Sequence, residues 1–432
     1  MDELTAGAAL AAVFRADHGR VLARLIGLLG DFDIAEEALA DAYAAAARNW
    51  PDGGVPDCPA AWLLTTARRR GVDAIRRART RVSYLPALAT EMRLSAGDPD
   101  PSDQQVTEGV PDVVGDDRLR LFFTCCHPAI DQQAQVALML RCLAGLSTAE
   151  VARLFLTSEA TVSQRIVRAK RKIRETRIPF RVPDRDQLPG RLRAVLAVLY
   201  LMFTEGHTAT RGPQLVRDEL CDESIRLARS LHELLPAEPE VTALLALLLL
   251  TDSRRAARRT ATSQLVPLAE QDRSRYDHRT ITEGRHLLTQ AIQAAPPNQY
   301  AVQAAIAAVH ADAPTAADTD WPQIVRLYQI LRTVVPPSPM VELNHAIAVA
   351  EADGPLAGIA LLDTLAAESS LATLHLFHAA RAELLRHLGR TGEAAAEYDT
   401  AIALSTNEAE RSHLTRRRDQ LTEGERLNGE IT

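Results

Sequence analysis

The stretch LSTAEVARLFLTSEATVSQRIVRAKRKIR, residues 146–174, has the pattern of two helices joined by a tight turn. Ser147 and Glu150 are spaced as a capping box, which opens the first helix. Thr157 or Ser158 is suited to cap the second helix, because short hydroxyl side chains accept hydrogen bonds from free amides. The second helix carries an apolar stripe at helical spacing, made of Val162, Ile166, Ala169 and Ile173.

A second face of the same helix is basic. Arg165, Arg168 and Lys172 recur at three- and four-residue intervals, with Lys170, Arg171 and Arg174 adding charge near the end. A helix-turn-helix of this form places its second helix in the major groove of DNA, where Gln and Arg read bases and other cations hold phosphates. The alternative is a solvated basic hairpin with no ligand.

A second basic segment lies upstream, in WLLTTARRRGVDAIRR, residues 62–77. Seven arginines between residues 68 and 81 face a single acid, Asp73. Such a helix suits phosphate contacts and single-strand binding. A solvent-exposed helix end would have the same composition.

The regions around these segments predict the domain organisation. We expect a helical unit over 8–82, a flexible acidic linker over 83–117, and a second helical unit over 118–178. Residues 190–432 read as successive helices with short Pro- and Gly-containing breaks, which is typical of an α-solenoid. The predicted fold class is therefore all-α.

Composition agrees with this fold class. The 432 residues are 47% hydrophobic, 24% charged and only 4% aromatic, with a net charge of −7, so any DNA binding must depend on local basic clusters. The N-terminus lacks the basic start of a signal peptide, and the longest apolar run, residues 243–250, is too short to span a bilayer. These features predict a cytoplasmic protein without a membrane partner.

The ordered segments resemble the extracytoplasmic-function family of RNA polymerase sigma factors. Residues 33–43, DIAEEALADAY, resemble the helix that docks on core polymerase; residues 62–77 resemble the −10 region; residues 146–172 resemble the −35 region. The chain departs from the family in having Arg69 where asparagine is usual, which affects base preference at the −10 element. The family's linker threads the polymerase cleft.

The resemblance implies three sets of binding residues. Contacts to the −35 element are expected from Ser158, Glu159, Ala160, Thr161, Ser163, Gln164, Arg165, Arg168, Lys170, Arg171 and Lys172. Contacts to the −10 element are expected from Trp62, Arg68, Arg69, Arg70, Asp73, Arg76, Arg77 and Arg79. Contacts to the clamp of the largest polymerase subunit are expected from Asp33, Glu36, Glu37, Leu39 and Asp41. Family members often pair with a membrane anti-sigma factor, for which this sequence carries no sign.

The C-terminal part resembles tetratricopeptide repeats most closely over 373–406, with a weaker unit near 341–366. The segment YLMFTEGH, residues 200–207, is similar to the junction motif of a sigma-factor subgroup, the group designated forty-two, whose extension takes part in regulation. We interpret Glu205 and His207 as part of a structural junction, the alternative being an acid/base pair. The ligand or protein partner of this extension is left open.

No cofactor, metal or catalytic residue is predicted. Cys125, Cys126 and His127 invite a metal site, but adjacent cysteines do not easily ligate one tetrahedral ion, so core packing is favoured. Phosphate-binding Gly-rich loops and hydrolase motifs are not evident, so the chain is not predicted to be an enzyme.

The sequence therefore predicts a sigma factor that recognises −35 and −10 elements with core polymerase and is modulated by its C-terminal helices. The main alternative is a stand-alone helix-turn-helix regulator with a helical sensor domain. That reading leaves the arginine-rich first unit and the acidic linker unexplained. A scaffold or hydrolase dominated by the C-terminal part is a third reading.

Overall fold

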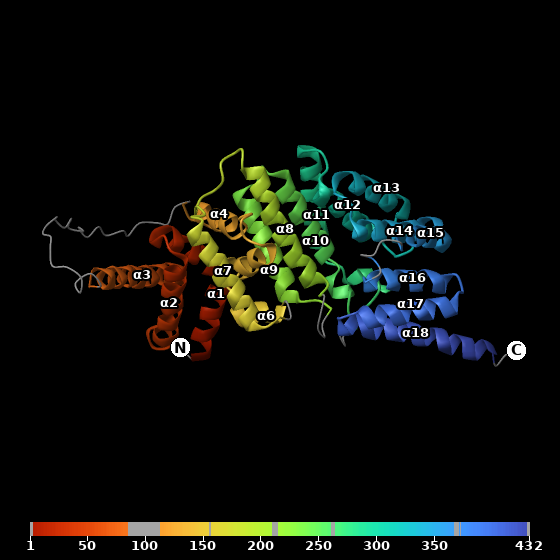
Figure 1. Ribbon diagram of the computed structural model, residues 1–432, viewed down its shortest axis with the longest axis horizontal. Helices are drawn as coiled ribbons and strands as arrows, with labels where there is room; N and C mark the ends of the chain where they lie inside the picture. The colour runs from red at the N-terminus through yellow and green to blue at the C-terminus, as the bar shows by residue number, and fades with distance from the viewer. Residues whose placement is uncertain are drawn as a thin grey trace. The chain divides into compact units, whose positions relative to one another are not determined.

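The computed structural model describes residues 3–84, 113–154, 157–209, 215–260, 264–366, 371 and 373–429. No named strand occurs in these ranges, and the chain forms successive helices, as the all-α prediction requires (Figure 1). Within the same ranges, none of the helices is both long and apolar enough to cross a membrane. The chain divides into two compact units, and the division falls inside helix α8 (Leu188–His207), between Val198 and Leu199.

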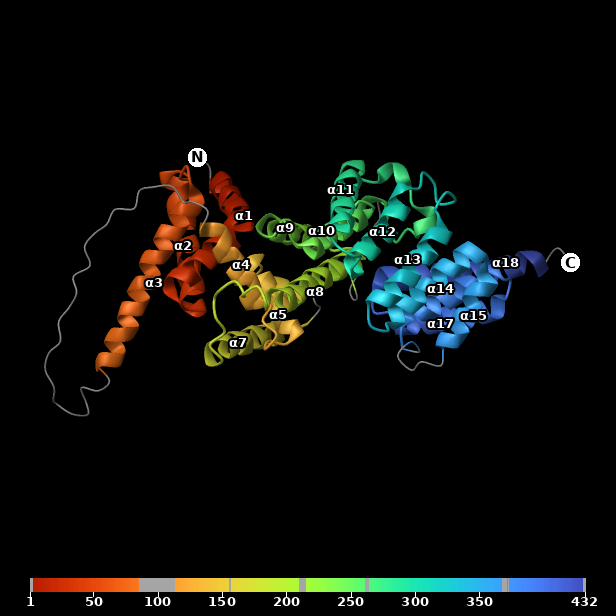
Figure 2. The same cartoon turned by 90° about the horizontal axis from the view of Figure 1, so that it is seen from above.

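Three helices form the first part of unit 1: α1 (Glu3–Leu29), α2 (Phe32–Gly53) and α3 (Pro59–Tyr84). Each of the three contacts the other two, and α2 and α3 lie side by side in Figure 2. Their shared core includes Leu22, Leu39 and Leu63, all at most 1% exposed. At Gly71 of α3 an added Cβ would lie 2.4 Å from a methyl group of Leu29, so the missing side chain allows α1 and α3 to approach closely.

The cap of α2 lies two residues upstream of the position that local spacing predicts. Asp33 and Glu36 are spaced as a capping box, which predicts Asp33 as the cap. In the structure Asp31 is the cap and accepts from the amides of Asp33 and Ile34. Moving the start of the helix by two residues leaves Asp33 in its first turn, where an acid interacts favourably with the helix dipole.

The second part of unit 1 contains six elements: α4 (Val113–Cys125), α5 (Gln132–Leu138), a π-helical turn η2 (Met139–Leu143), α6 (Thr148–Leu154), α7 (Glu159–Glu175) and the first half of α8. The predicted linker, 83–117, needs correction at both ends, because α3 continues to Tyr84 and α4 begins at Val113. Asp117 is buried and bonds Arg24 of α1 at 3.0 Å and Arg120 at 2.8 Å. This acid therefore has a packing role, since an ion pair fixes it between two helices; residues 85–112 lie outside the described ranges.

Unit 2 contains the second half of α8 and the helices α9 (Asp218–Leu234), α10 (Pro239–Asp252), α11 (His278–Ala294), α12 (Gln299–Asp312), α13 (Trp321–Val334), α14 (Pro339–Asp353), α15 (Pro355–Leu365), α16 (His375–His387), α17 (Thr391–Leu404) and α18 (Glu408–Gly429). Helix α10 is buried on every side from Val241 to Leu250, so it is the central helix that α9, α11 and α12 contact. The segments expected to resemble repeats form the helix pairs α14–α15 and α16–α17 (Figure 1).

One part of unit 2 departs from the expected helix-after-helix pattern. Between α10 and α11, the described residues include three short 3-10 turns, η3 (Arg255–Ala257), η4 (Leu268–Glu270) and η5 (Arg273–Arg275). The sequence here is rich in arginine and poor in apolar periodicity, so it has no stripe that would hold a long helix against a neighbour.

Candidate nucleic-acid interface

Helix α7 has the construction that its sequence predicts. Ser158 caps it by accepting from the amide of Thr161 at 3.1 Å, while the capping box of α6 closes with Ser147 and Glu150 bonding one another's amides. The apolar stripe is buried, at 1–7% exposure across Val162, Ile166, Ala169 and Ile173. Burial of this stripe fixes the rotation of the helix and thereby determines where each cation points.

The predicted −35 contacts divide into free and engaged groups. Ser158 and Thr161 bond one another, and Arg171 pairs with Glu175 at 3.6 Å. Among the residues that the structure describes, no carboxylate pairs with Arg165, Arg168 or Lys172. The remaining predicted positions are exposed: Glu159, Ala160, Ser163 and Gln164. The outward face of α7 thus combines exposed polar side chains with cations that have no carboxylate partner among the described residues, as groove binding requires.

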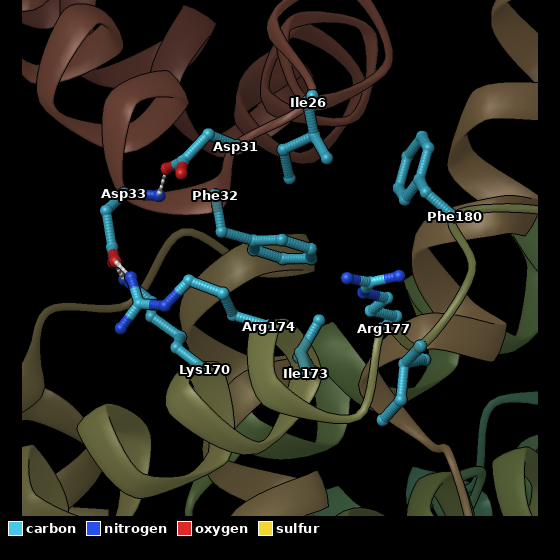
Figure 3. A pocket seen from close by; sticks show the side chains of 11 residues that line it. Ile26, Asp31, Phe32, Asp33, Lys170, Ile173, Arg174, Arg177 and Phe180 are labelled. Atoms are coloured by element: carbon cyan, nitrogen blue, oxygen red, sulfur yellow. Dashed lines mark hydrogen bonds and ion pairs between the residues drawn. The ribbon is translucent and has the colours of Figure 1, made fainter. Parts of the chain in front are cut away.

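Lys170 lies on a different side of α7 and faces α2. Its ammonium is 3.1 Å from Asp33, which lies in the first turn of α2 (Figure 3). The ammonium also bonds Glu36, three residues further along the same helix. The side chain of Lys170 is only 12% exposed and that of Glu36 only 15%. The structure therefore joins one predicted DNA contact to two predicted polymerase contacts.

Further charges complete this contact, which we call the α2–α7 ion-pair cluster: Asp33, Glu36, Arg141, Lys170 and Arg174. Arg174 lies 3.4 Å from Asp33, and Arg141 lies 3.5 Å from Glu36. Burial by itself would lower the pKa of Lys170, but Glu36 and Asp33 outweigh that effect and raise it. The lysine therefore remains charged at neutral pH.

A cavity of about 250 Å³ lies beside the cluster, between the α1–α2 turn and the end of α7. Phe32 and Phe180 meet edge to face across it, with ring centroids 6.4 Å apart, and Ile26 and Ile173 line its wall (Figure 3). The α2–α7 contact is thus partly apolar and incompletely packed.

The close approach of α1 to η2 strengthens the same arrangement. A Cβ added to Gly19 would lie 2.5 Å from the backbone oxygen of Leu143, so only glycine permits this contact. Gly145, at the turn after η2, has φ +75°, a left-handed conformation that glycine adopts without strain. Backbone packing and ion pairs therefore hold the two parts of unit 1 together.

The arginine-rich segment lies on α3 as expected. Arg68, Arg69, Arg76 and Arg77 are exposed, as is Asp73. The ring of Trp62 meets that of Trp50 edge to face at 5.7 Å, which anchors the start of α3 to the end of α2. The side chain of Arg79 lies outside the described residues.

The predicted polymerase-binding residues separate into surface and core. Glu37 and Asp41 are exposed on α2, and Asp41 pairs with Arg70 of α3 at 3.1 Å. Leu39, expected at the polymerase interface, is 1% exposed and packs inside the three-helix core. This expectation needs correction, because the apolar stripe of α2 faces α1 and α3 and not the surface.

The two parts of unit 1 each match a known protein family model, in the same order along the chain. Residues 13–81 match the family model described as Sigma-70 region 2, and residues 123–173 match Sigma-70, region 4. An ECF RNA polymerase sigma factor SigK of Mycolicibacterium vanbaalenii is 32% identical over 169 residues, 38% of this chain and 81% of that protein. This chain belongs to the extracytoplasmic-function family of sigma-70 factors.

The SigK of Mycobacterium tuberculosis is 28% identical over 168 residues, 39% of this sigma factor and 84% of the relative. An uncharacterized protein of Rhizobium meliloti is 41% identical over 403 residues, 93% of each chain, and so shares the C-terminal extension. Residues 191–292 match DUF6596, a family of unknown function. No solved structure is significantly similar to this chain.

Membership of this family makes the sigma factor a non-enzymatic initiation factor. In keeping with a packing role, Cys125 and Cys126 are fully buried, and burial raises the pKa of the Cys126 thiol. Among the described residues, no group of three or more His, Cys, Asp or Glu side chains is arranged to hold a metal ion.

The two residues of the junction segment that suggested an acid/base pair have separate partners in the sigma factor. Glu205 is 7% exposed and lies 3.5 Å from Arg217, whereas His207 accepts from Arg258 at 2.8 Å. Arg258 was not singled out in the sequence, although it belongs to the conspicuous run RRAARR, residues 254–259. The only sequence feature that indicates Arg258 is that it lies in a run of positive charges without helical periodicity.

Proposed function

We propose that this sigma factor binds core RNA polymerase and directs promoter-specific initiation by recognising −35 and −10 elements. The exposed half of α7, with Arg165, Arg168 and Lys172 free of carboxylates among the described residues, supports a −35 contact in the major groove. The exposed arginines of α3 support contacts to −10 DNA, and the acids of α2 support docking on the clamp of the largest subunit.

The α2–α7 ion-pair cluster is proposed to be the form that precedes polymerase binding. Glu36 is covered by Lys170 and Arg141, so a polymerase contact at Glu36 requires α7 to leave α2. The cluster would delay engagement until polymerase and promoter together replace its ion pairs. The C-terminal helices are proposed to modulate this activity.

Run-off transcription tests the proposal. The full-length protein is mixed with core polymerase and a library of promoter fragments, and transcripts are sequenced. We expect specific transcripts that require both the protein and core enzyme, beginning downstream of shared −35 and −10 sequences. Binding to DNA alone, with core polymerase remaining inactive, would instead favour the stand-alone regulator.

A further inference from the structure

Unit 2 contains a cavity of about 300 Å³. Helix α8 contributes Tyr200, Phe203 and His207 to its lining, and α12 contributes His310. Arg254, from the segment after α10, completes this side of the cavity. The lining therefore includes the junction segment, residues 200–207, to which promoter recognition assigns no role.

The guanidinium of Arg254 lies close enough to those of Arg258 and Arg273 for the positive charges to repel one another. Burial and the neighbouring Arg273 lower the pKa of Arg254, while Tyr276 acts in the opposite direction. Burial, followed by the charge of Arg254, lowers the pKa of Arg258 to about 10. Each of these guanidinium groups would be stabilised by an added negative charge.

Neighbouring arginines of the same segment differ in whether they form ion pairs. Arg255 lies 2.7 Å from Asp252, and Arg259 lies 2.6 Å from Asp218. Within the described ranges, Arg254, Arg258 and Arg273 form no ion pair with a carboxylate. Arg258 and Arg273 bond neutral oxygens instead. The segment therefore places Arg255 and Arg259 in ion pairs, whereas Arg254, Arg258 and Arg273 take part in none within the described ranges.

Three buried polar atoms of the lining have no hydrogen-bond partner among the described residues: Nε of Arg254, Nε2 of His207 and Nδ1 of His310. Buried polar groups without partners are rare, and a bound ligand or water commonly satisfies them. Nδ1 of His207 accepts from Arg258, and burial keeps the pKa of that imidazole well below its usual range. In the neutral ring the proton must then sit on Nε2, which makes that atom a donor.

The rest of the lining is apolar or aromatic. Phe203 stacks on His207 with ring centroids 5.5 Å apart, and Leu247 and Ile306 add aliphatic surface. The hydroxyl of Tyr200 is engaged with Gln303 at 2.8 Å. A dry cavity of about 150 Å³ is enough to hold benzene, so this one has room for a ring with a charged substituent.

We propose that this cavity binds a small organic anion, a carboxylate carried on an aromatic or other apolar body. The carboxylate would pair with the guanidinium of Arg254, and the body would lie against Phe203 and Ile306. The proposal concerns unit 2 and is independent of promoter recognition by unit 1. It gives the C-terminal extension a ligand of stated chemistry.

Calorimetry and thermal melting of the full-length protein test this site with benzoate, phenylphosphate and the uncharged benzamide. We expect saturable binding of benzoate and no binding of benzamide, because only the anion matches the unpaired cation. Arg254→Met should weaken benzoate binding about tenfold or more, as expected for the loss of a charged hydrogen bond. Arg259→Met, in the same segment but paired with Asp218, should leave it within about twofold.

Imidazole nitrogen shifts of the wild-type protein provide a second measurement that does not depend on the folding of a variant. Benzoate should shift the signals of His207 and His310 but not that of the exposed His286. Equal binding of benzamide and benzoate, or benzoate binding unaffected by Arg254→Met, would overturn the proposal. So would the absence of saturable binding by either anion at millimolar concentration.

Discussion

Arg165, Arg168 and Lys170 are close neighbours on one helix, but their surroundings differ. The two arginines have no carboxylate partner among the described residues, whereas Lys170 is held by Asp33 and Glu36. Residue type therefore does not determine which cation is free. The burial of the apolar stripe of α7 sets the direction of each side chain and so assigns the cations to different roles.

Replacing Arg165 or Arg168 by alanine should weaken −35-dependent transcription about tenfold, a loss of about 1.4 kcal/mol. Each replacement should also reduce the slope of log affinity against log salt by about 1, since one phosphate contact is lost. Filter binding and run-off assays over a range of salt concentrations measure both effects. Arg285→Ala, an exposed arginine of unit 2, is the control. Unchanged transcription and an unchanged salt slope in both variants would contradict the assignment of α7.

At the scale of elements, one face of α7 is exposed and the other packs against α2. Its exposed half offers cations and polar groups, while the face that carries Lys170 packs on α2 beside a 250 Å³ cavity. Incomplete packing, together with ion pairs that include the exposed side chains of Asp33 and Arg174, makes a contact that other partners can replace. A fully packed apolar interface would be harder to open.

Lys170→Glu should open this contact, because it puts a third acid beside Asp33 and Glu36. Fluorescence energy transfer between probes on exposed positions of α3 and α7 should show a longer and broader distance distribution. Lys172→Glu makes the same charge change at an exposed site that has no ion pair within the described ranges, and it should leave the distribution unchanged. A Lys170→Glu protein with wild-type distances would show that the ion pairs do not hold α7 on α2.

In the helix pair α16–α17, one carboxylate, that of Glu383, is held by two hydrogen-bond donors. Glu383 accepts from the buried Tyr398 at 2.6 Å and from Arg386 at 2.6 Å. Burial raises the pKa of Glu383, but these partners outweigh it and bring the pKa to about 2. The folded-state pKa is therefore below the unfolded value of about 4.3, so this stabilisation is present above the unfolded value and lost as pH falls toward 2.

Glu383→Gln should accordingly lower the melting temperature at pH 7, and its difference from wild type should shrink from about pH 5 downward. Melting curves over this pH range measure the difference. Asp353→Asn changes an exposed acid that makes no ion pair within the described ranges, and it should give a small, pH-independent difference. A Glu383→Gln difference that stayed constant with pH would contradict the depressed pKa.

At the scale of the whole molecule, the boundary inside α8 determines how the extension should be removed. A cut at residue 190 would remove Leu192 and Val195, which are buried, and Arg191, which bonds the backbone oxygen of Phe123. A cut after Val198 keeps all of unit 1. Truncation at that point separates the effect of the extension from damage to the DNA-binding part.

We predict that the protein ending at Val198 uses the same promoters as the full chain but yields a different amount of transcript. A change of about fivefold or more is expected, at the lower end of typical coupling between sites. Run-off transcription with sequenced transcripts measures yield and promoter choice together, and a thermal melt checks folding. Full activity with altered promoter choice would contradict a modulatory extension.

The sequence by itself determined the all-α class, the order of the two sigma regions, the caps of α6 and α7, and the buried stripe of α7. These features are local, since helix periodicity and capping depend on residues within a few positions of one another. Only the tertiary structure decided that Leu39 is a core residue, that Asp117 belongs to α4, and that Lys170 pairs with Glu36. The physical reason is that burial and ion pairing depend on side chains from different helices, 93 positions apart for Arg24 and Asp117 and 134 for Glu36 and Lys170. Their approach is set by packing and not by spacing.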